Sequence, residues 1–208
     1  MSQAPIGWVL AIGLAAVLAP DQQVFGRDHQ SSPLAKGAPR RQIQHPIQDF
    51  SLADQEGKPF RFQSSRGKVV LVSFIYTTCP DVCPLITASM RLVQEGLKPS
   101  ERQSVQFLSI TTDPEVDTPQ VLKSYAERYK VDFSNWSFVT GDLKSLEAVW
   151  KAFGVKVQRK ARGLVNHTAL TALIDKKGVM RFAYDGAAPD HKMILQDTRR
   201  LLASNAKY

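Results

Sequence analysis

The run KVVLVSFIY, residues 68–76, constrains the fold of this chain more than any other segment. Apolar, β-branched and aromatic residues fill it almost without interruption, so it lacks the alternation of a strand with one exposed face. A run of this kind is typical of a strand covered on both faces, as in the centre of an α/β sheet. The sequence therefore predicts an α/β domain with this strand inside its sheet.

Further strand patterns lie on both sides of this run. DFSLADQEGKPFRF, residues 49–62, is typical of a hairpin with its turn at EGK, and residues 105–112 and 136–140 are expected to be strands. TALTALID and VMRFAY, separated by KKG within residues 168–184, indicate a second hairpin. The strand expected from TALTALID should run beside the central one.

Helix signals fill the intervals between these strands. Pro84 suits the first turn of a helix, where its missing N–H costs nothing. Asp117 or Thr118 is expected to cap the next helix and Asp142 the third, and residues 190–202 form a last amphipathic pattern. This order predicts one layered domain in which helices cover a mixed sheet.

The composition divides the chain into three regions. Residues 1–20 contain 14 uncharged, mostly apolar residues from Ile6 to Ala19. As a helix they would reach about 21 Å, against a hydrocarbon core of roughly 30 Å, which suits a signal segment or a short membrane tether. Residues 21–42 are rich in Ser, Pro, Gly and basic residues and are expected to be a flexible linker. Residues 43–208 are expected to form the folded domain.

The chain is basic, with a formal net charge of +8. The excess is not confined to the N-terminal region, because 23 Lys and Arg face 17 Asp and Glu after residue 42. Such a balance favours an anionic membrane surface, an acidic partner or nucleic acid, and charge alone does not choose among them. No Lys/Arg run is interleaved with aromatic residues, which argues against nucleic acid.

The segment TTCPDVCP, residues 77–84, holds both cysteines of the chain. Cys79 follows the central strand and Cys83 lies at the amino end of the next helix, where ligand sites occur in open α/β sheets. Free N–H groups and the helix dipole there favour thiolate, so both sulfurs are expected to be reactive and close together. The pair can be a disulfide staple, a redox couple or part of a metal site. A staple closing so short a loop would add little stability.

Of the four histidines, His167 is the one that the pattern brings towards the cysteines. It precedes the buried strand expected beside the central one, and on this pattern alone a metal ligand and a core histidine are equally good interpretations. His29 and His45 lie in or at the end of the expected linker, and His191 begins the last helix, so these three are expected to be solvated.

From about Ile43 to its end, the chain resembles the Sco/SenC family of copper-binding proteins. The resemblance rests on FSLADQEGKPF, YTTCPDVCP, SITTDPEVDTP and VNHTALTALID. It implies a thioredoxin-like fold with an added N-terminal β-hairpin, and a role in assembling the copper centre of cytochrome c oxidase. It also implies that Cys79, Cys83 and His167 are copper ligands, with Asp113 as a candidate that orients or tunes the site. Asp113 is equally well interpreted as a turn residue before Pro114.

The chemistry of these donors agrees with the resemblance. Two thiolates and one imidazole suit Cu(I), which accepts few ligands, whereas structural zinc normally takes four. The same set would give a Cu(II) site near neutral charge, so binding of both oxidation states is a hypothesis. The expected partner is the copper-binding subunit of cytochrome c oxidase or another cuproprotein.

The main alternative is a thiol-disulfide oxidoreductase that reduces a partner cuproprotein. The C-x-x-x-C spacing and the absence of proline in NHTALTAL argue against it as the sole role. Lys156, Arg159, Lys160 and Arg162, which precede His167, can steer an acidic partner in either case. Because no Arg- and Ser-rich leader is present, the expected location is the bacterial inner membrane facing the periplasm, or the periplasm itself if the N-terminal segment is cleaved.

Overall fold

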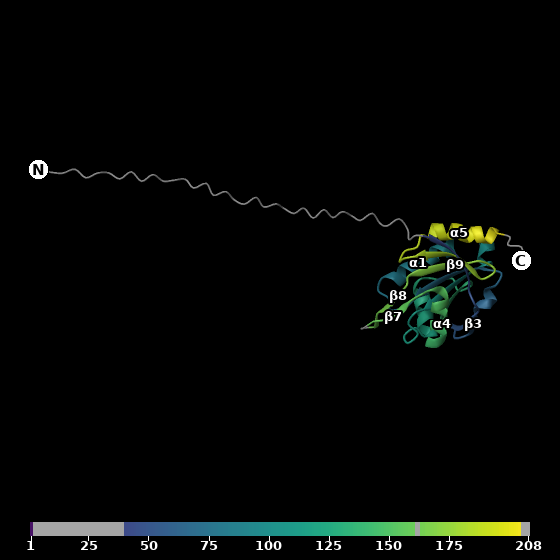
Figure 1. The fold of residues 1–208 in the computed structure, drawn as a ribbon, viewed down its shortest axis with the longest axis horizontal. Coiled ribbons are helices and arrows are strands. Elements are labelled where there is room, and N and C mark those ends of the chain that lie inside the picture. The colour runs from purple at the N-terminus through teal and green to yellow at the C-terminus, as the bar shows by residue number, and fades with distance from the viewer. Residues whose placement is uncertain (2–39, 161–162, 205–208) are drawn as a thin grey trace. The chain divides into compact units, whose positions relative to one another are not determined.

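The computed structural model describes Met1, residues 40–160 and residues 163–204. Figure 1 shows a central sheet with helices packed against it. The sheet strands are β1 (Arg40–Pro46), β2 (Ser51–Asp54), β3 (Pro59–Arg61), β4 (Val69–Ile75), β5 (Val105–Thr111), β6 (Trp136–Thr140), β9 (Leu170–Ile174) and β10 (Val179–Asp185). A small second sheet contains β7 (Val157–Arg159) and β8 (Val165–His167). The helices are η1 (Phe62–Ser65), α1 (Val82–Gly96), α2 (Pro99–Arg102), α3 (Pro119–Arg128), α4 (Leu143–Phe153) and α5 (His191–Ala203).

The strand predicted to be central lies in the middle of the sheet. The order is β1-β10-β9-β4-β5-β6-β2-β3, and every residue of β4 is buried. β4 pairs with β5 in parallel and with β9 in the antiparallel direction. Both predicted hairpins, β2–β3 and β9–β10, form antiparallel pairs. The mixed α/β fold expected from the sequence is therefore confirmed.

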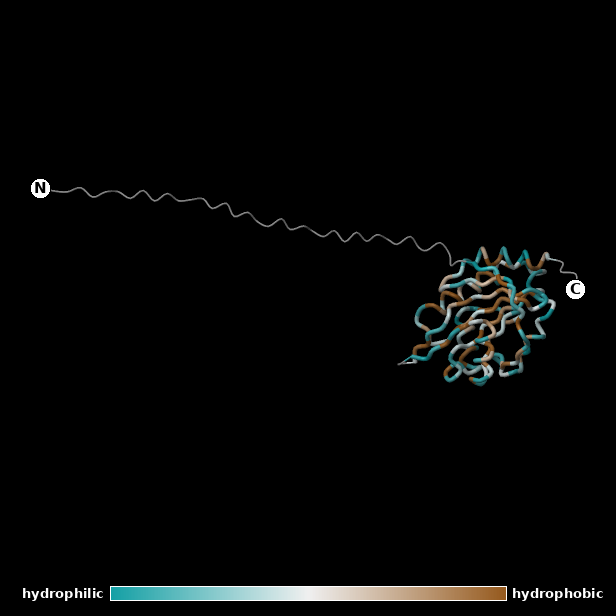
Figure 2. Tube along the Cα trace, viewed as in Figure 1, coloured by the Kyte–Doolittle hydropathy of each residue, from teal (hydrophilic) through white to brown (hydrophobic). Residues whose placement is uncertain are grey.

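Alternate residues of β4 enter two separate cores, as their opposite directions require. Leu71 packs with residues of α1, α3 and α5 on one face, and Val72 packs with residues of α4 and the β2–η1 region on the other. Figure 2 shows the hydrophobic residues concentrated inside the domain, along the strands and the inner sides of the helices. The continuous apolar run is therefore explained by two covered faces.

The predicted helix ends occur where their sequence signals lie. The Thr118 hydroxyl accepts a hydrogen bond from Val121 N–H, and the Asp142 carboxylate accepts one from Ser145 N–H. Gly154 ends α4 with φ +70°, a conformation that glycine adopts without steric cost.

The first strand begins three residues before the boundary expected at Ile43. β1 starts at Arg40 and pairs with β10. Two ion pairs hold it: Arg40 with Asp197 of α5 (2.7 Å), and Arg41 with Asp185 of β10 (2.5 Å). β1 is mostly polar, so its sequence has no apolar pattern that would predict a strand. The residues that hold it in place are distant in sequence and could not be predicted from the local pattern.

The expected tether, residues 1–20, lies outside the described residues except for Met1, as does the linker up to residue 39. Within the described part of the chain, no helix has the length and apolar character needed to cross a bilayer.

Candidate metal centre

The cysteine loop joins the carboxyl end of β4 to the amino end of α1. Cys79 N–H donates to the carbonyl of Tyr76 (3.2 Å), which closes a turn directly after the strand. Cys83 N–H then donates to the Cys79 sulfur (3.4 Å), and Tyr76 N–H donates to the Cys83 sulfur (3.4 Å). The two thiols are free and share one hydrogen-bonded loop, as their spacing predicted.

The two cysteines differ in their environment. Burial raises the pKa of Cys79, but hydrogen bonds from the N–H groups of Cys83 and Asp81 outweigh it, so this pKa lies below its ordinary value. Cys83 is fully buried, and burial raises its pKa far above the ordinary value. The raised pKa of Cys83 opposes the thiolate expected for it. Its side chain faces the core, where desolvation outweighs the helix dipole.

His167 ends β8 and lies against Cys83. Its Nδ1 is 3.1 Å from the carbonyl of Thr168, which can only accept, so Nδ1 carries the proton. The unprotonated Nε2 lies 3.6 Å from the Cys83 sulfur. Burial lowers the pKa of His167, which favours the neutral imidazole that binds metals. Tyr76 packs edge-on against the ring, with centroids 5.8 Å apart.

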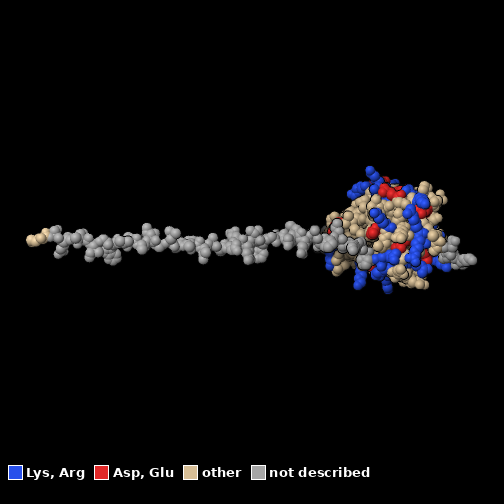
Figure 3. Space-filling model, turned by 90° about the horizontal axis from the view of Figure 1, so that it is seen from above, with Lys and Arg blue, Asp and Glu red and all other residues tan. Residues whose placement is uncertain are grey.

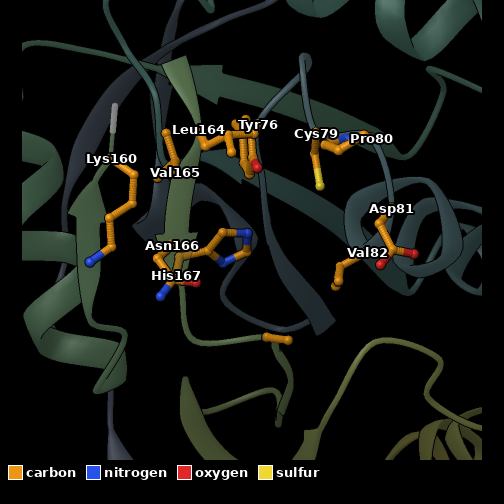
Figure 4. A pocket seen from close by; sticks show the side chains of 11 residues that line it. Tyr76, Cys79, Pro80, Asp81, Val82, Lys160, Leu164, Val165, Asn166 and His167 are labelled. Atoms are coloured by element: carbon orange, nitrogen blue, oxygen red, sulfur yellow. The ribbon is translucent and has the colours of Figure 1, made fainter. Parts of the chain in front are cut away.

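A pocket opens between the cysteine loop and the β7–β8 hairpin. Figure 4 shows the Cys79 sulfur pointing into it from one wall, and the His167 ring facing it from the other. The lining residues come from these two segments and the end of β4: Tyr76, Cys79, Pro80, Asp81, Val82, Lys160, Leu164, Val165, Asn166, His167 and Ala169. Cys83 is buried and does not line the pocket, but it contacts both Cys79 and His167. The three predicted residues therefore meet at one place.

The expected Asp113 lies near this site but does not line the pocket. Its side chain is buried and forms an ion pair with Arg159 of β7, whose guanidinium also pairs with Glu115 at 2.6 Å. Burial raises the pKa of Asp113, and the Arg159 charge opposes that rise. Asp113 thus connects the end of β5 to the hairpin that carries His167.

Asp117 has a closer connection to the cysteine loop, and the sequence suggested only a helix cap for it. Its fully buried carboxylate accepts hydrogen bonds from Thr77 N–H (3.2 Å) and the Thr77 hydroxyl (2.5 Å). The Thr111 hydroxyl donates to its other oxygen (2.5 Å). Thr77 stands two residues before Cys79, so this carboxylate fixes the base of the loop. The sequence contained one signal for this role of Asp117. It is the second aspartate of DPEVD, which follows a strand that lies parallel to β4.

The basic residues before His167 are not equally available to a partner. Arg159 is engaged by two carboxylates, whereas Lys160 lines the pocket. Arg162 lies outside the described residues, as does His29. His45 is exposed on β1 and His191 starts α5, so neither joins the pocket.

Two thiols and one imidazole are a donor set that suits copper, but they are not arranged as a finished site. Within residues 40–160 and 163–204, no group of three or more His, Cys, Asp or Glu side chains has the spacing of a metal site. Figure 4 shows the pocket between the Cys79 sulfur and the His167 ring, so joint binding of one metal ion requires these two side chains to approach each other. The residue types themselves fit copper.

The fold and this thiol pair define a thioredoxin-like protein with two free cysteines after its central strand. A sequence model of the SCO1/SenC family matches residues 38–203. The chain therefore belongs to the SCO1/SenC family.

Individual relatives agree with this assignment. The SCO1 protein homolog of Bacillus subtilis (strain 168) is 33% identical over 147 residues, which cover 69% of this chain and 76% of that protein. A structure of BsSco, described as a member of the Sco family of cytochrome c oxidase assembly proteins, is 30% identical with a TM-score of 0.69 and covers 79% and 98% of the two chains. Copper-bound ScoI of Bradyrhizobium japonicum is 28% identical with a TM-score of 0.65 and covers 75% and 99%.

Proposed function

We propose that this protein is a copper metallochaperone that binds Cu(I) and Cu(II) through Cys79, Cys83 and His167. The observation that carries the proposal is the contact of Cys83 with both Cys79 and His167, although His167 lies 84 residues beyond Cys83 in the sequence. The copper-bound relative supports the choice of metal. Soft sulfur donors with one neutral imidazole suit Cu(I), and the net charge that they provide also tolerates Cu(II).

The chain's own residues prepare the site for a metal ion. Cys79 supplies the more acidic and more accessible thiol, because its sulfur accepts backbone hydrogen bonds and faces the pocket. Thr168 holds the imidazole so that Nε2 presents its lone pair towards Cys83. Cys83 must lose its proton when a metal binds, since a metal ligand is a thiolate. Copper uptake should therefore release protons.

The proposed recipient is the copper-binding subunit of cytochrome c oxidase or another cuproprotein. The Sco family name of a relative, which refers to cytochrome c oxidase assembly, supports this choice. The proposed location is the bacterial inner membrane, with the domain facing the periplasm, or the periplasm if the N-terminal segment is removed. The apolar residues 6–19 support it, and they lie outside the described residues.

An anaerobic Cu(I) competition titration on the reduced full-length chain tests the ligand set. We expect one tightly bound copper per chain, and a loss of affinity above about a hundredfold for Cys79→Ala, Cys83→Ala or His167→Ala. His191→Ala is the matched control, because it removes a histidine that does not line the pocket, and should bind as the unmodified chain does. If His167→Ala binds Cu(I) as tightly as the unmodified chain, the proposal is wrong.

A second function, thiol-disulfide exchange, is favoured by the contrast between the two thiols. The Cys79 thiolate attacks a partner disulfide, which forms a mixed disulfide and releases one partner sulfur as a thiolate. Cys83 then gives its proton to solvent and displaces the remaining partner sulfur. The products are a Cys79–Cys83 disulfide and a partner reduced by two electrons.

Rapid mixing with a cysteine-containing peptide disulfide separates the two functions. Reduction of the peptide at a rate unaffected by His167→Ala, together with weak copper binding, would make thiol exchange the primary role. Tight copper binding that needs His167, with slow exchange, would make copper handling primary.

A further inference from the structure

The positive charge of the chain is concentrated at one end of the domain, and the copper proposal leaves it unexplained. At the end where β4 and β5 begin, four segments are joined by short contacts. Gly67 N–H donates to the Lys176 carbonyl (2.9 Å), Lys176 Nζ to the Leu202 carbonyl (2.8 Å), and Arg199 Nη2 to the Gly96 carbonyl (2.8 Å). We call this surface the basic end. Its cations are Arg66, Lys68, Lys98, Arg102, Lys176, Lys177, Arg181, Arg199 and Arg200.

Few acidic side chains accompany these nine cations. Among the described residues of this end, the carboxylates are Asp175, Glu101 and Asp132, and they pair with Arg181, Arg199 and Arg102. Nine positive and three negative charges leave +6, which is most of the formal +8 of the whole chain. Glu95 lies nearby, but it pairs with Arg91 and changes nothing in this count.

Part of this positive charge balances the negative ends of two helices. α1 and α5 end on this side, and each helix C-terminus carries about half a negative charge, which cations stabilise. Lys176 and Arg199 serve this purpose directly, since they donate to the terminal carbonyls of α5 and α1. Two helix ends offset only about one unit of the +6. The basic end therefore retains a strong positive field.

The basic end lies opposite the candidate metal centre. β4 starts beside it at Val69 and runs the length of the sheet to Ile75, directly before the cysteine loop. Seven residues of strand separate the two by about 20 Å, which exceeds the screening length at physiological salt. Figure 3 shows Lys and Arg side chains at several places on one face of the domain, with Asp and Glu side chains among them, so the basic end is defined by its residues.

We propose that the basic end binds the anionic lipid headgroups of a membrane surface, so that the copper pocket faces away from the bilayer. The cations come from four separate segments and spread over a surface, as attraction to a charged plane requires. The segments 66–68, 97–102, 176–181 and 199–204 contain no aromatic residue on which a nucleic-acid base could stack. The proposal does not depend on copper binding by the pocket.

Vesicle co-sedimentation of the full-length chain tests this proposal. The probes are phosphatidylcholine vesicles with and without about 30% phosphatidylglycerol, at about 0.05 M and about 0.5 M salt. The test variant carries Lys68→Gln, Lys98→Gln, Lys177→Gln and Arg200→Gln. We expect the unmodified chain to prefer anionic vesicles at low salt, and the variant to lose this preference by about tenfold or more. Any contribution of residues 6–19 is common to both chains and cancels in the comparison.

A variant with the same net charge provides the matched control. Lys144→Gln, Lys151→Gln, Lys156→Gln and Lys192→Gln remove four exposed lysines that lie outside the basic end. This control should keep its preference for anionic vesicles within about twofold. Equal losses in both variants would show a general effect of net charge and overturn the proposal. It is also wrong if the basic-end substitutions weaken binding to duplex DNA and leave vesicle binding unchanged. Copper titration of the same variants should be unaffected.

Discussion

At the residue scale, the candidate site depends on a carboxylate that binds no metal. Asp117 is fully buried, yet it accepts hydrogen bonds from Thr77 N–H and from the hydroxyls of Thr77 and Thr111. Burial raises its pKa, while the threonine donors oppose that rise. A buried carboxylate lowers the stability of the folded state unless its oxygen atoms accept hydrogen bonds. Asp117 follows β5 and is hydrogen-bonded to the neighbouring loop, so it holds in place the segment that carries the cysteines.

We predict that Asp117→Ala lowers Cu(I) affinity by about ten- to a hundredfold, because the loop loses its anchor two residues before Cys79. The competition titration described above measures it. Thr111→Val is the matched control. It removes a donor to the same carboxylate without touching the loop, and should cost about 1–3 kcal/mol of stability with copper affinity retained. If both variants lose affinity in proportion to their lost stability, Asp117 has only a structural role.

The local pattern placed Cys79 and Cys83 at the ends of recognisable elements, whereas His167 was singled out as a ligand only by the resemblance to the Sco/SenC family. The sequence could not show that Cys83 is buried, since the same helical position faces solvent or core depending on what packs against it. Arg159 illustrates the same limit. Its sequence context suggested a residue that steers an acidic partner, but two carboxylates 44 and 46 positions away hold it in place.

At the element scale, helix α2 is fastened to α5 by one ion pair. Arg199 contacts Glu101 through two nitrogens, at 3.0 and 3.2 Å. This hydrogen bonding lowers the pKa of Glu101, despite an opposing effect of burial. A carboxyl group whose pKa is lowered on folding stabilises the folded state above its unfolded pKa, and the effect disappears as pH falls through the folded pKa.

We predict that Glu101→Gln lowers the free energy of unfolding by about 0.5 kcal/mol near pH 7, as expected for a partly exposed pair. The difference should shrink below about pH 4.3, the unfolded pKa, and vanish once the pH lies below the lowered folded pKa, where the glutamate of the unmodified chain is protonated in both states. Urea unfolding at several pH values measures it. Glu147→Gln, at an exposed position of α4, is the matched control and should change the free energy of unfolding by less than about 0.5 kcal/mol. A difference that persists at the lowest pH would exclude the ion pair as its cause.

At the scale of the whole molecule, stability depends on the two cores that β4 separates. Leu71 has no exposed surface and packs against the helices on one face. We predict that Leu71→Ala costs about 2–5 kcal/mol, because the packed helices cannot collapse into the cavity. Urea unfolding is the measurement. Leu143→Ala, at a leucine that is 52% exposed, should stay within about 0.5 kcal/mol. Similar losses at both sites would contradict the assignment of β4 to the centre.

The sequence by itself determined the central strand, the order of the major helices and strands, and the placement of both cysteines at a strand end. These features depend on local periodicity and on residues within one element. The tertiary structure alone decided the pairing of β1, the contact of Asp117 with Thr77, the burial of Cys83 and the gathering of positive charge opposite the pocket. Each of these arises where segments distant in sequence pack together, and no local pattern records which segments will meet.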